Sequence, residues 1–259
     1  MSPSFYEPAG PGAFIATNAT AGPWTPDAQH GGPPSALAAR EIELHEAQEH
    51  MRLARVAVDI LRPVPLGPLT LRTRTLRPGK RIALIETVME SAGQEVLCAR
   101  GWRIAMPDAV PVITREVDVP EIPEHSVREA FRGAYLHGYL AQIDWRFVSG
   151  TFTDPGPCKA WGRPRIPLLP GEDMTPMCRT LLLADSGSGV SMALDPMTYL
   201  SINVDLTVVL QRDPVGEWLM LDGLSTMGGT GTGLAETLLW DTQGVAGSAY
   251  RHCWLRPGK

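Results

Sequence analysis

A histidine, two glycines and two prolines, residues 30–34, stand directly in front of a segment with helical periodicity. From Ser35 onward apolar residues recur at the spacing of one helix face, and a first helical turn tolerates prolines because its N–H groups have no partner within the helix. Gly31 and Gly32 are therefore predicted at a helix N-terminus, where unpaired N–H groups can hold an anion or a developing oxyanion. The alternative is an entry turn in which the glycines only shape the backbone and His30 caps the helix.

The composition is that of an ordinary globular protein. The chain has 259 residues, of which 44% are hydrophobic and 20% charged, so it can bury a substantial core as one large domain or two small ones. A net charge of -5 argues against a general nucleic-acid binder, although it leaves room for a local basic patch that binds a phosphorylated small molecule. No stretch approaches the ~18 apolar residues of a membrane span, and no basic region precedes an apolar one at the N-terminus. We expect a cytoplasmic protein with no membrane or nucleic-acid partner.

Cysteine and histidine spacing predicts neither a disulfide nor a metal site. The four cysteines are far apart and form no C-x-x-C pair, which indicates free thiols in a reducing compartment. The six histidines are scattered, and none pairs with a second ligand type at the spacing of one helical turn. We expect no metal and no other cofactor.

The chain contains an internal repeat. One copy begins with Val-Asp at Val58 and the other with Val-Asp at Val204. Both continue through a Pro-x-Gly turn, a Leu-x-Glu-Thr step and a late glycine, which is Gly93 in the first copy and Gly244 in the second. Self-similarity of this kind is typical of a duplicated structural unit. Two homologous halves are therefore predicted.

Each copy has the pattern of three antiparallel strands. In the first, residues 69–77 and 96–105 alternate between apolar and polar side chains, residues 82–90 are rich in β-branched ones, and glycine turns separate the three. A glycine-rich helix start precedes each meander, "QHGGPPSALAAR" in the first half and "LADSGSGVSMAL" in the second. More extended sequence precedes each helix, at residues 13–18, 142–148 and 158–166.

One long helix packed on a bent antiparallel sheet, present twice, is the architecture of a double hotdog, an α+β fold. We predict an N-terminal hotdog repeat over residues 1–106, a linker rich in proline and acidic residues over 107–137, and a C-terminal hotdog repeat over 138–259. The two sheets are expected to join edge to edge, with both helices on the concave side. An outer sheet face that stays apolar favours a homo-oligomer.

Six segments carry a family resemblance, and they occur in the order that the family has. They are "GPWTPDAQHGGPPSALAAR", "LRPVPLGPL", "LRPGKR", "WRFVSGTF", "ADSGSGVS" and "GEWLMLDG". Together they resemble the acyl-CoA thioesterase II type of double-hotdog protein, in its actinobacterial thioesterase-like branch, over residues 12–256. The resemblance implies a thioester hydrolase of fatty acid metabolism, which converts acyl-CoA to free acid and CoA with base-activated water and no cofactor.

The resemblance places the catalytic carboxylate at Asp185, at the start of the second-half helix. Asp185 would take a proton from water, and its alternative role is to cap the helix N-terminus, where a carboxylate also stays ionised. Two further polar positions of the family, a threonine and a glutamine, align with Asn203 and Tyr250. Either side chain can donate a hydrogen bond that orients water or the carbonyl group. In the alternative interpretation, Asn203 ends a loop and Tyr250 packs in a sheet.

The remaining site residues follow from the same resemblance. The amides of Gly31 and Gly32 would hold the thioester carbonyl oxygen, while His30 would contact the water or the acyl chain. The basic turn with Arg77, Lys80 and Arg81 is the candidate for binding the CoA phosphates. The alternative is that this turn is only a solvated hairpin tip.

Two motifs suggest other enzyme classes but lack the context those classes require. "GGTGTG" precedes a strand pattern and not the helix of a dinucleotide-binding loop. "DSGSGVS" has no glycine two residues before Ser188, as a nucleophile elbow needs, and no aspartate and histidine are spaced at a helix start as in a hydratase. The main alternative to a hydrolase is a catalytically weak or inactive protein that binds acyl-CoA or an acyl chain, because two polar positions of the family are substituted.

Overall fold

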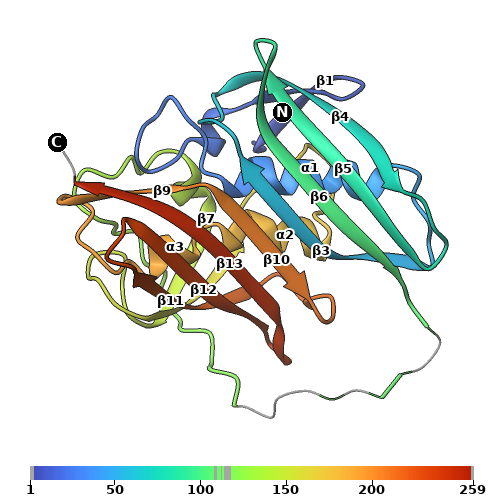
Figure 1. Ribbon diagram of the computed structural model, residues 1–259. Coiled ribbons are helices and arrows are strands. Elements are labelled where there is room, and N and C mark those ends of the chain that lie inside the picture. The colour runs from blue at the N-terminus through green and yellow to red at the C-terminus, as the bar shows by residue number, and fades with distance from the viewer. Residues whose placement is uncertain (1–2, 108–109, 112, 114–117, 258–259) are drawn as a thin grey trace.

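The alternating segments of the first half form strands at the predicted places. The computed structural model describes residues 3–107, 110–111, 113 and 118–257 (Figure 1). The strands of this half are β1 (Tyr6–Gly10), β2 (Ala13–Ala16), β3 (Met51–Ile60), β4 (Gly67–Arg77), β5 (Ile82–Ser91) and β6 (Gln94–Ala105). β4, β5 and β6 are the three strands of the predicted meander, and they pair antiparallel with one another in that order.

The second half continues the same sheet. Its strands are β7 (Ile143–Ser149), β8 (Cys158–Pro164), β9 (Tyr199–Asn203), β10 (Asp205–Leu210), β11 (Leu219–Met227), β12 (Thr232–Asp241) and β13 (Gly244–Pro257). Within the described residues one sheet of 13 strands runs β1-β2-β4-β5-β6-β3-β10-β13-β12-β11-β8-β7, and β9 pairs with β13. The halves meet at β3 and β10, where Val56 lies opposite Val208. The predicted edge-to-edge junction is confirmed.

The helices begin at one predicted place and at one unexpected place. Helix α1 (Gly32–Leu44) follows Gly31 and has prolines in its first turn, as predicted. The second-half helix does not begin at Asp185. Helix α2 (Pro176–Ala184) begins earlier, because the Thr175 hydroxyl accepts the N–H of Cys178 and a proline fits the first helical position. Asp185 is the C-cap of α2, and a short helix α3 (Gly187–Val190) follows it, so two short helices replace the single long one expected.

The helices α1 and α2 lie side by side on one face of the sheet (Figure 1). α1 packs against β3, β4, β5 and β6, whereas α2 packs against β8, β10 and β11. The two backbones come so close that a Cβ atom on Gly32 would lie 2.1 Å from the carbonyl oxygen of Leu182. This approach therefore requires a glycine, and one apolar core extends through both halves.

A smaller apolar cluster lies on the opposite face of the second-half sheet. Trp161, Met220 and Trp240 are buried there, and Val119 and Ile122 from the chain between the halves pack against them. Part of the predicted linker, residues 107–137, thus covers this face of the sheet. Its residues 108–109, 112 and 114–117 lie outside the described part of the chain.

Three further features of the described residues concern disulfides, membrane spans and metal sites. The four cysteines are free thiols. No helix in the described part of the chain has both the length and the apolar character needed to cross a membrane. Among the described residues, no group of three or more histidine, cysteine, aspartate or glutamate side chains is arranged to hold a metal ion.

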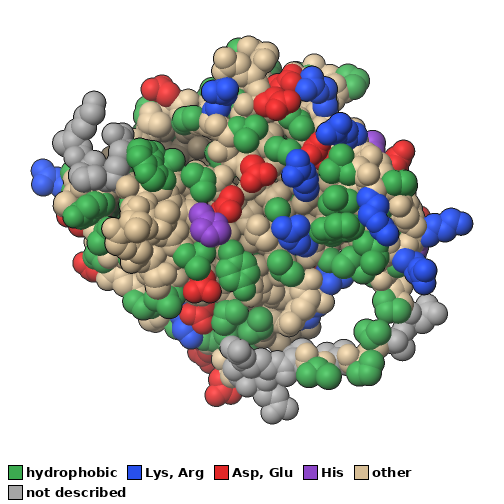
Figure 2. Space-filling view, in the orientation of Figure 1, with side chains coloured by type: hydrophobic (Ala, Val, Ile, Leu, Met, Phe, Trp, Pro, Cys, Tyr) green, Lys and Arg blue, Asp and Glu red, His purple; other side chains and the backbone are tan. Residues whose placement is uncertain are grey.

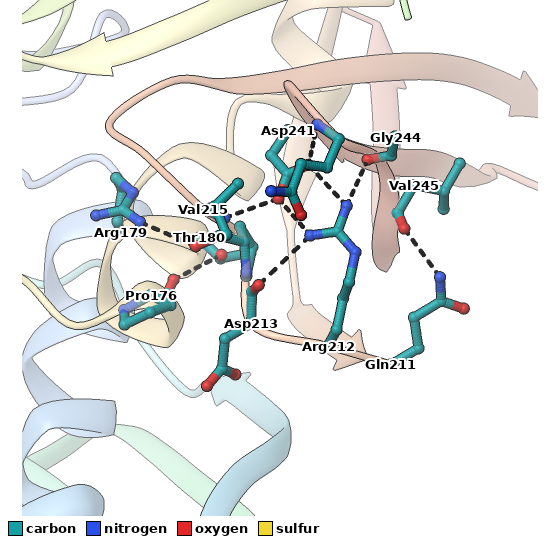
Figure 3. A network of polar contacts seen from close by, with 12 residues as sticks. Pro176, Arg179, Thr180, Gln211, Arg212, Asp213, Val215, Asp241, Gly244 and Val245 are labelled. Carbon is teal, nitrogen blue, oxygen red and sulfur yellow. Dashed lines mark hydrogen bonds and ion pairs between the residues drawn. The ribbon is translucent and has the colours of Figure 1, made fainter. Parts of the chain in front are cut away.

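An ion pair between a partly exposed arginine and a buried carboxylate ties two connections of the second-half sheet together (Figure 3). The Asp241 carboxylate is fully buried, and Arg212 donates to both of its oxygens, with Nη2 at 2.6 Å from Oδ1. The backbone N–H groups of Val215 and Gln243 donate to the same carboxylate, each at 2.7 Å. Burial alone would raise the pKa of Asp241, but these hydrogen bonds hold it below its ordinary value. The loop between β10 and β11 is thereby fastened to the turn between β12 and β13.

We predict that Asp241→Asn lowers the free energy of unfolding by about 2–4 kcal/mol, because it removes the charge that compensates Arg212 and one acceptor of the network. Urea unfolding at neutral pH measures the change. The matched control is Asp222→Asn, since Asp222 contacts Lys159 at 3.3 Å at the partly exposed surface and its loss should cost less than about 0.5 kcal/mol. Equal losses in the two variants would contradict the structural role given to Asp241.

Candidate active site

A cavity of about 140 Å³ opens where the first turn of α1 meets the end of α2. Among the side chains that line it, four from separate segments form a polar group: His30 before α1, Asp185 between α2 and α3, Asn203 on β9 and Arg251 on β13. Much of the remaining lining is apolar and includes Trp24, Phe131, Phe152, Met192, Met227 and Leu255. The cavity thus combines a small polar group with a hydrocarbon-like wall.

Asp185 is the centre of the polar group, with only 1% of its side chain exposed. Three nitrogen-bearing side chains surround its carboxylate. His30 Nδ1 lies 3.1 Å from Oδ2, the Asn203 amide donates to Oδ1 at 3.3 Å, and Arg251 Nη2 lies 3.5 Å from Oδ1. Only the Asn203 amide makes a hydrogen bond to the carboxylate, and Oδ2 is enclosed without a hydrogen-bond partner among the described residues, so acceptor capacity of the carboxylate remains unused.

His30 is held in one orientation by its neighbours. Its ring stacks on the Tyr139 ring with centroids 3.8 Å apart, and its Nδ1 lies 3.1 Å from the N–H nitrogen of Gly32. Because Nδ1 also faces Asp185, this one nitrogen either accepts from Gly32 or donates to Asp185, according to where the ring carries its proton. Burial lowers the pKa of His30 from 6.5 to about 4, while the Asp185 charge opposes the decrease and the Arg251 charge adds to it. The ring is therefore neutral at physiological pH.

Gly31 and Gly32 shape the site through their lack of side chains. A Cβ atom on Gly31 would lie 2.9 Å from Asp185 Oδ2, and one on Gly32 would collide with the backbone of α2. Gly31 lines the cavity, whereas the N–H of Gly32 faces the His30 ring. The structure thus brings His30 and both glycines to Asp185.

Tyr250 does not join this group. Its side chain is 41% exposed and does not line the cavity, because consecutive residues of a strand point to opposite faces of the sheet. The inward position belongs to the next residue, Arg251, which reaches Asp185. The alternation of buried residues through Ala249, Arg251 and Cys253 is the pattern that could have identified it from the sequence.

The basic turn after β4 is also separate from the cavity. None of its three basic residues lines the cavity. Arg77 donates to the carbonyl of Ile82 and so closes its own turn, and the Lys80 carbonyl lies 2.9 Å from His50 Nε2. Arg81 is exposed. Figure 2 shows Lys and Arg side chains gathered over the first-half strands, on the face opposite the helices.

Aromatic residues that the sequence analysis did not select frame the cavity. Tyr139 supports the His30 ring, and its hydroxyl donates to the Leu182 carbonyl at 2.9 Å. Trp24 and Phe131 stack with their centroids 4.5 Å apart, and both line the cavity. Trp24 and Phe131 come from loops before α1 and between the halves, and Tyr139 begins a short 3-10 helix (Tyr139–Gln142), so no local periodicity could have indicated their role.

The arrangement is suited to acid–base chemistry on a ligand with a hydrocarbon part. A fixed carboxylate can take a proton from water, and N–H donors beside it can hold an oxygen that becomes negative. The apolar lining can receive an acyl chain but gives little support to a highly charged ligand.

We predict that His30 makes the protein less stable in acid. The folded protein keeps His30 unprotonated down to a pKa of about 4, whereas the unfolded chain binds a proton near 6.5. The free energy of unfolding should therefore fall as pH decreases from about 6.5 to about 4, by up to about 3 kcal/mol from this residue. Urea unfolding at several pH values, compared with His30→Asn, isolates the effect. The exposed His137 supplies the control His137→Asn, and an acid dependence that is the same in His30→Asn as in the wild type would refute the prediction.

Comparison with known proteins covers both halves of the chain. Residues 20–104 match the acyl-CoA thioesterase N-terminal domain, and residues 116–251 match the acyl-CoA thioesterase C-terminal domain. No curated protein matches the sequence.

Solved structures share the fold over nearly the whole chain. A hotdog-fold protein of unknown function from Alicyclobacillus acidocaldarius has a TM-score of 0.75 and 15% identity, covering 98% of this chain and 96% of that one. An acyl-CoA thioesterase II from Mycobacterium marinum has a TM-score of 0.67 and 15% identity, covering 98% and 95%. The TesB protein of Mycobacterium avium subspecies paratuberculosis has a TM-score of 0.66 and 16% identity, covering 97% and 96%. These likenesses show the hotdog fold, and since the two domain matches span most of the sequence, the chain belongs to the acyl-CoA thioesterase family.

Proposed function

We propose that the protein hydrolyses the thioester of acyl-CoA to a free acid and CoA, with Asp185 as the base that activates water. The observation that carries this proposal is the buried Asp185 carboxylate, fixed by three nitrogen-bearing side chains in a cavity with apolar walls. Membership of the acyl-CoA thioesterase family supports acyl-CoA as the substrate.

In the proposed reaction a water molecule lies between Asp185 and the thioester carbon. Asp185 takes one proton while the water oxygen forms a bond to that carbon, and the electron pair of the C=O bond moves onto the carbonyl oxygen. This pair returns as the carbon–sulfur bond breaks, and the leaving thiolate takes the proton from Asp185. The products are a free acid, which ionises, and the thiol of CoA.

Asn203 and His30 position the base in this proposal. Asn203 donates to Oδ1 and the His30 ring faces Oδ2, so the carboxylate is restrained on both oxygens. Gly31 keeps the α1 entry loop free of a side chain where the thioester approaches Asp185. Four residues that do not line the cavity have no part in the proposed step: Tyr250, Arg77, Lys80 and Arg81.

A protein that binds acyl-CoA without hydrolysing it is the second candidate. Three partners already surround the Asp185 carboxylate, and its Oδ2 atom is enclosed, which restricts the room for a water molecule. Measuring the CoA thiol released from a panel of acyl-CoA substrates separates the two functions. A hydrolase releases thiol, whereas a binding protein retains the intact thioester.

We further propose that residues 1–106 and 138–259 are two hotdog repeats joined by a linker over 107–137. The strand order supports this division. Moving outward from the junction, β3, β6, β5 and β4 on one side correspond in order to β10, β13, β12 and β11 on the other. The site proposed here uses segments of both repeats.

We predict that Asp185→Asn lowers hydrolysis by about 10²- to 10⁴-fold, because an amide cannot take a proton from water. The variant should also unfold at a lower temperature than the wild type, since Arg251 loses its charged partner. Thiol release is therefore measured below the unfolding transition of the variant. Asp222→Asn, at a residue that does not line the cavity, is the control and should hydrolyse at the wild-type rate. Wild-type activity in folded Asp185→Asn would exclude Asp185 as the base.

Gly31→Ala tests the placement of the carboxylate. Its Cβ atom would lie 2.9 Å from Asp185 Oδ2, so the carboxylate must move and hydrolysis should fall by about 10-fold or more. Gly229→Ala is the control, because a Cβ atom there meets no other atom within 4 Å. If both alanine variants release thiol at the same rate, the contact between Gly31 and Asp185 has no bearing on the reaction.

A further inference from the structure

Arg251 is a buried cation whose N–H groups the fold leaves largely unused. Its side chain lines the cavity from β13, and only 4% of the residue is exposed. Its one charged neighbour among the described residues is Asp185, at 3.5 Å from Nη2 to Oδ1. It donates no hydrogen bond to any described residue, and its Nε is enclosed without a partner.

A second arginine is buried among the described residues, and its contacts are those of a structural role. Arg103 is also 4% exposed, but its guanidinium donates to the carbonyls that end α1, at 3.0 Å to Glu43 and 2.6 Å to His45. Those contacts cap a helix and use both Nη groups of Arg103. A guanidinium carries five N–H donors and no acceptor. The Nε of Arg251 is buried without a partner and its Nη groups make no hydrogen bond to a described residue, so they are available to an acceptor from outside the chain.

The surroundings of Arg251 leave space for such an acceptor. Arg251 itself lines the cavity, and the residue opposite it on β12 is Ala235, whose side chain is a single methyl group. The N–H of Gly32, one of the two amides expected to hold the thioester carbonyl oxygen, faces the His30 ring instead. Arg251 is therefore the charged donor closest to the base on the cavity wall.

We propose that Arg251 is a catalytic residue that binds the oxygen which becomes negative, and that the same guanidinium then holds the carboxylate of the product. This inference rests on the proposed hydrolysis for its catalytic part. The thioester is neutral, whereas the tetrahedral intermediate and the product acid carry a negative oxygen, so a fixed guanidinium favours the later states over the substrate. A bidentate contact with a carboxylate suits the planar geometry of arginine.

The binding part can be tested without any hydrolysis. Hexanoate and hexanamide have the same length, and only the first is an anion. Calorimetric titration of the wild type should show hexanoate binding about 10-fold or more tightly than hexanamide. Arg251→Gln should abolish this preference and Arg251→Lys should keep part of it, while Arg55→Gln, on a side chain that does not line the cavity, should leave it unchanged.

Kinetics tests the catalytic part. Arg251→Gln should lower kcat by about 100-fold with KM within about threefold of the wild type, because the contact forms with charge that appears only during the reaction. If Arg251 only positioned Asp185, the Gln variant would keep the preference for hexanoate, which would overturn the proposal. Equal binding of hexanoate and hexanamide by the wild type would also overturn it. A preference for hexanoate that depends on Arg251, in a protein that releases no CoA, would support the carboxylate site and reject the proposed hydrolysis.

Arg251→Lys provides a second test in case the Gln variant does not fold. Lysine keeps the positive charge beside Asp185 but offers a compact ammonium in place of the planar guanidinium. Circular dichroism of each variant shows whether it is folded before binding is measured. A folded Lys variant with the full wild-type kcat and hexanoate preference would overturn the role given to the guanidinium.

Discussion

The contact between the first turn of α1 and the last turn of α2 fixes the position of the polar groups in the site. The helices approach so closely that Gly32 faces the carbonyl of Leu182 and Gly31 faces Asp185. A side chain at either glycine would push the helices or the carboxylate apart. His30, whose ring is stacked on Tyr139, would then lose its contact with Asp185. The close packing of the two helices therefore also determines the positions of Asp185 and His30 in the site.

The environments of two buried carboxylates distinguish a structural one, Asp241, from the one in the site, Asp185. Asp241 receives four hydrogen bonds from Arg212 and two backbone N–H groups, so the fold itself satisfies it. Asp185 is equally buried but has longer contacts, from 3.1 to 3.5 Å, and it lines a cavity. Because a buried charge without a partner is strongly unfavourable, Arg251 stabilises Asp185 in the folded state while keeping donors free.

Features that depend on consecutive residues could be predicted from the sequence, and features that depend on packing could not. Alternation and glycine turns located β4, β5 and β6, because strand geometry places every second side chain on one face. The start of the second helix was misplaced because Asp185 precedes glycines and resembles a cap, while the true start is the Thr-Pro step at residues 175–176. In β13, a shift of one residue reverses the face of the sheet, which distinguishes exposed Tyr250 from buried Arg251.

In the proposed hydrolysis, the pairing of Asp185 with Arg251 also explains why a cation can stay buried throughout the reaction. Before reaction the guanidinium faces the Asp185 carboxylate, and His30 is neutral. When Asp185 takes the proton of water, its own charge disappears and a negative charge forms on the carbonyl oxygen, at the same side of the cavity. Arg251 therefore keeps an anionic partner while the charge moves from protein to ligand. A site with a fixed cation next to both positions needs little reorganisation for this transfer, which is the condition under which buried electrostatic interactions contribute most to catalysis.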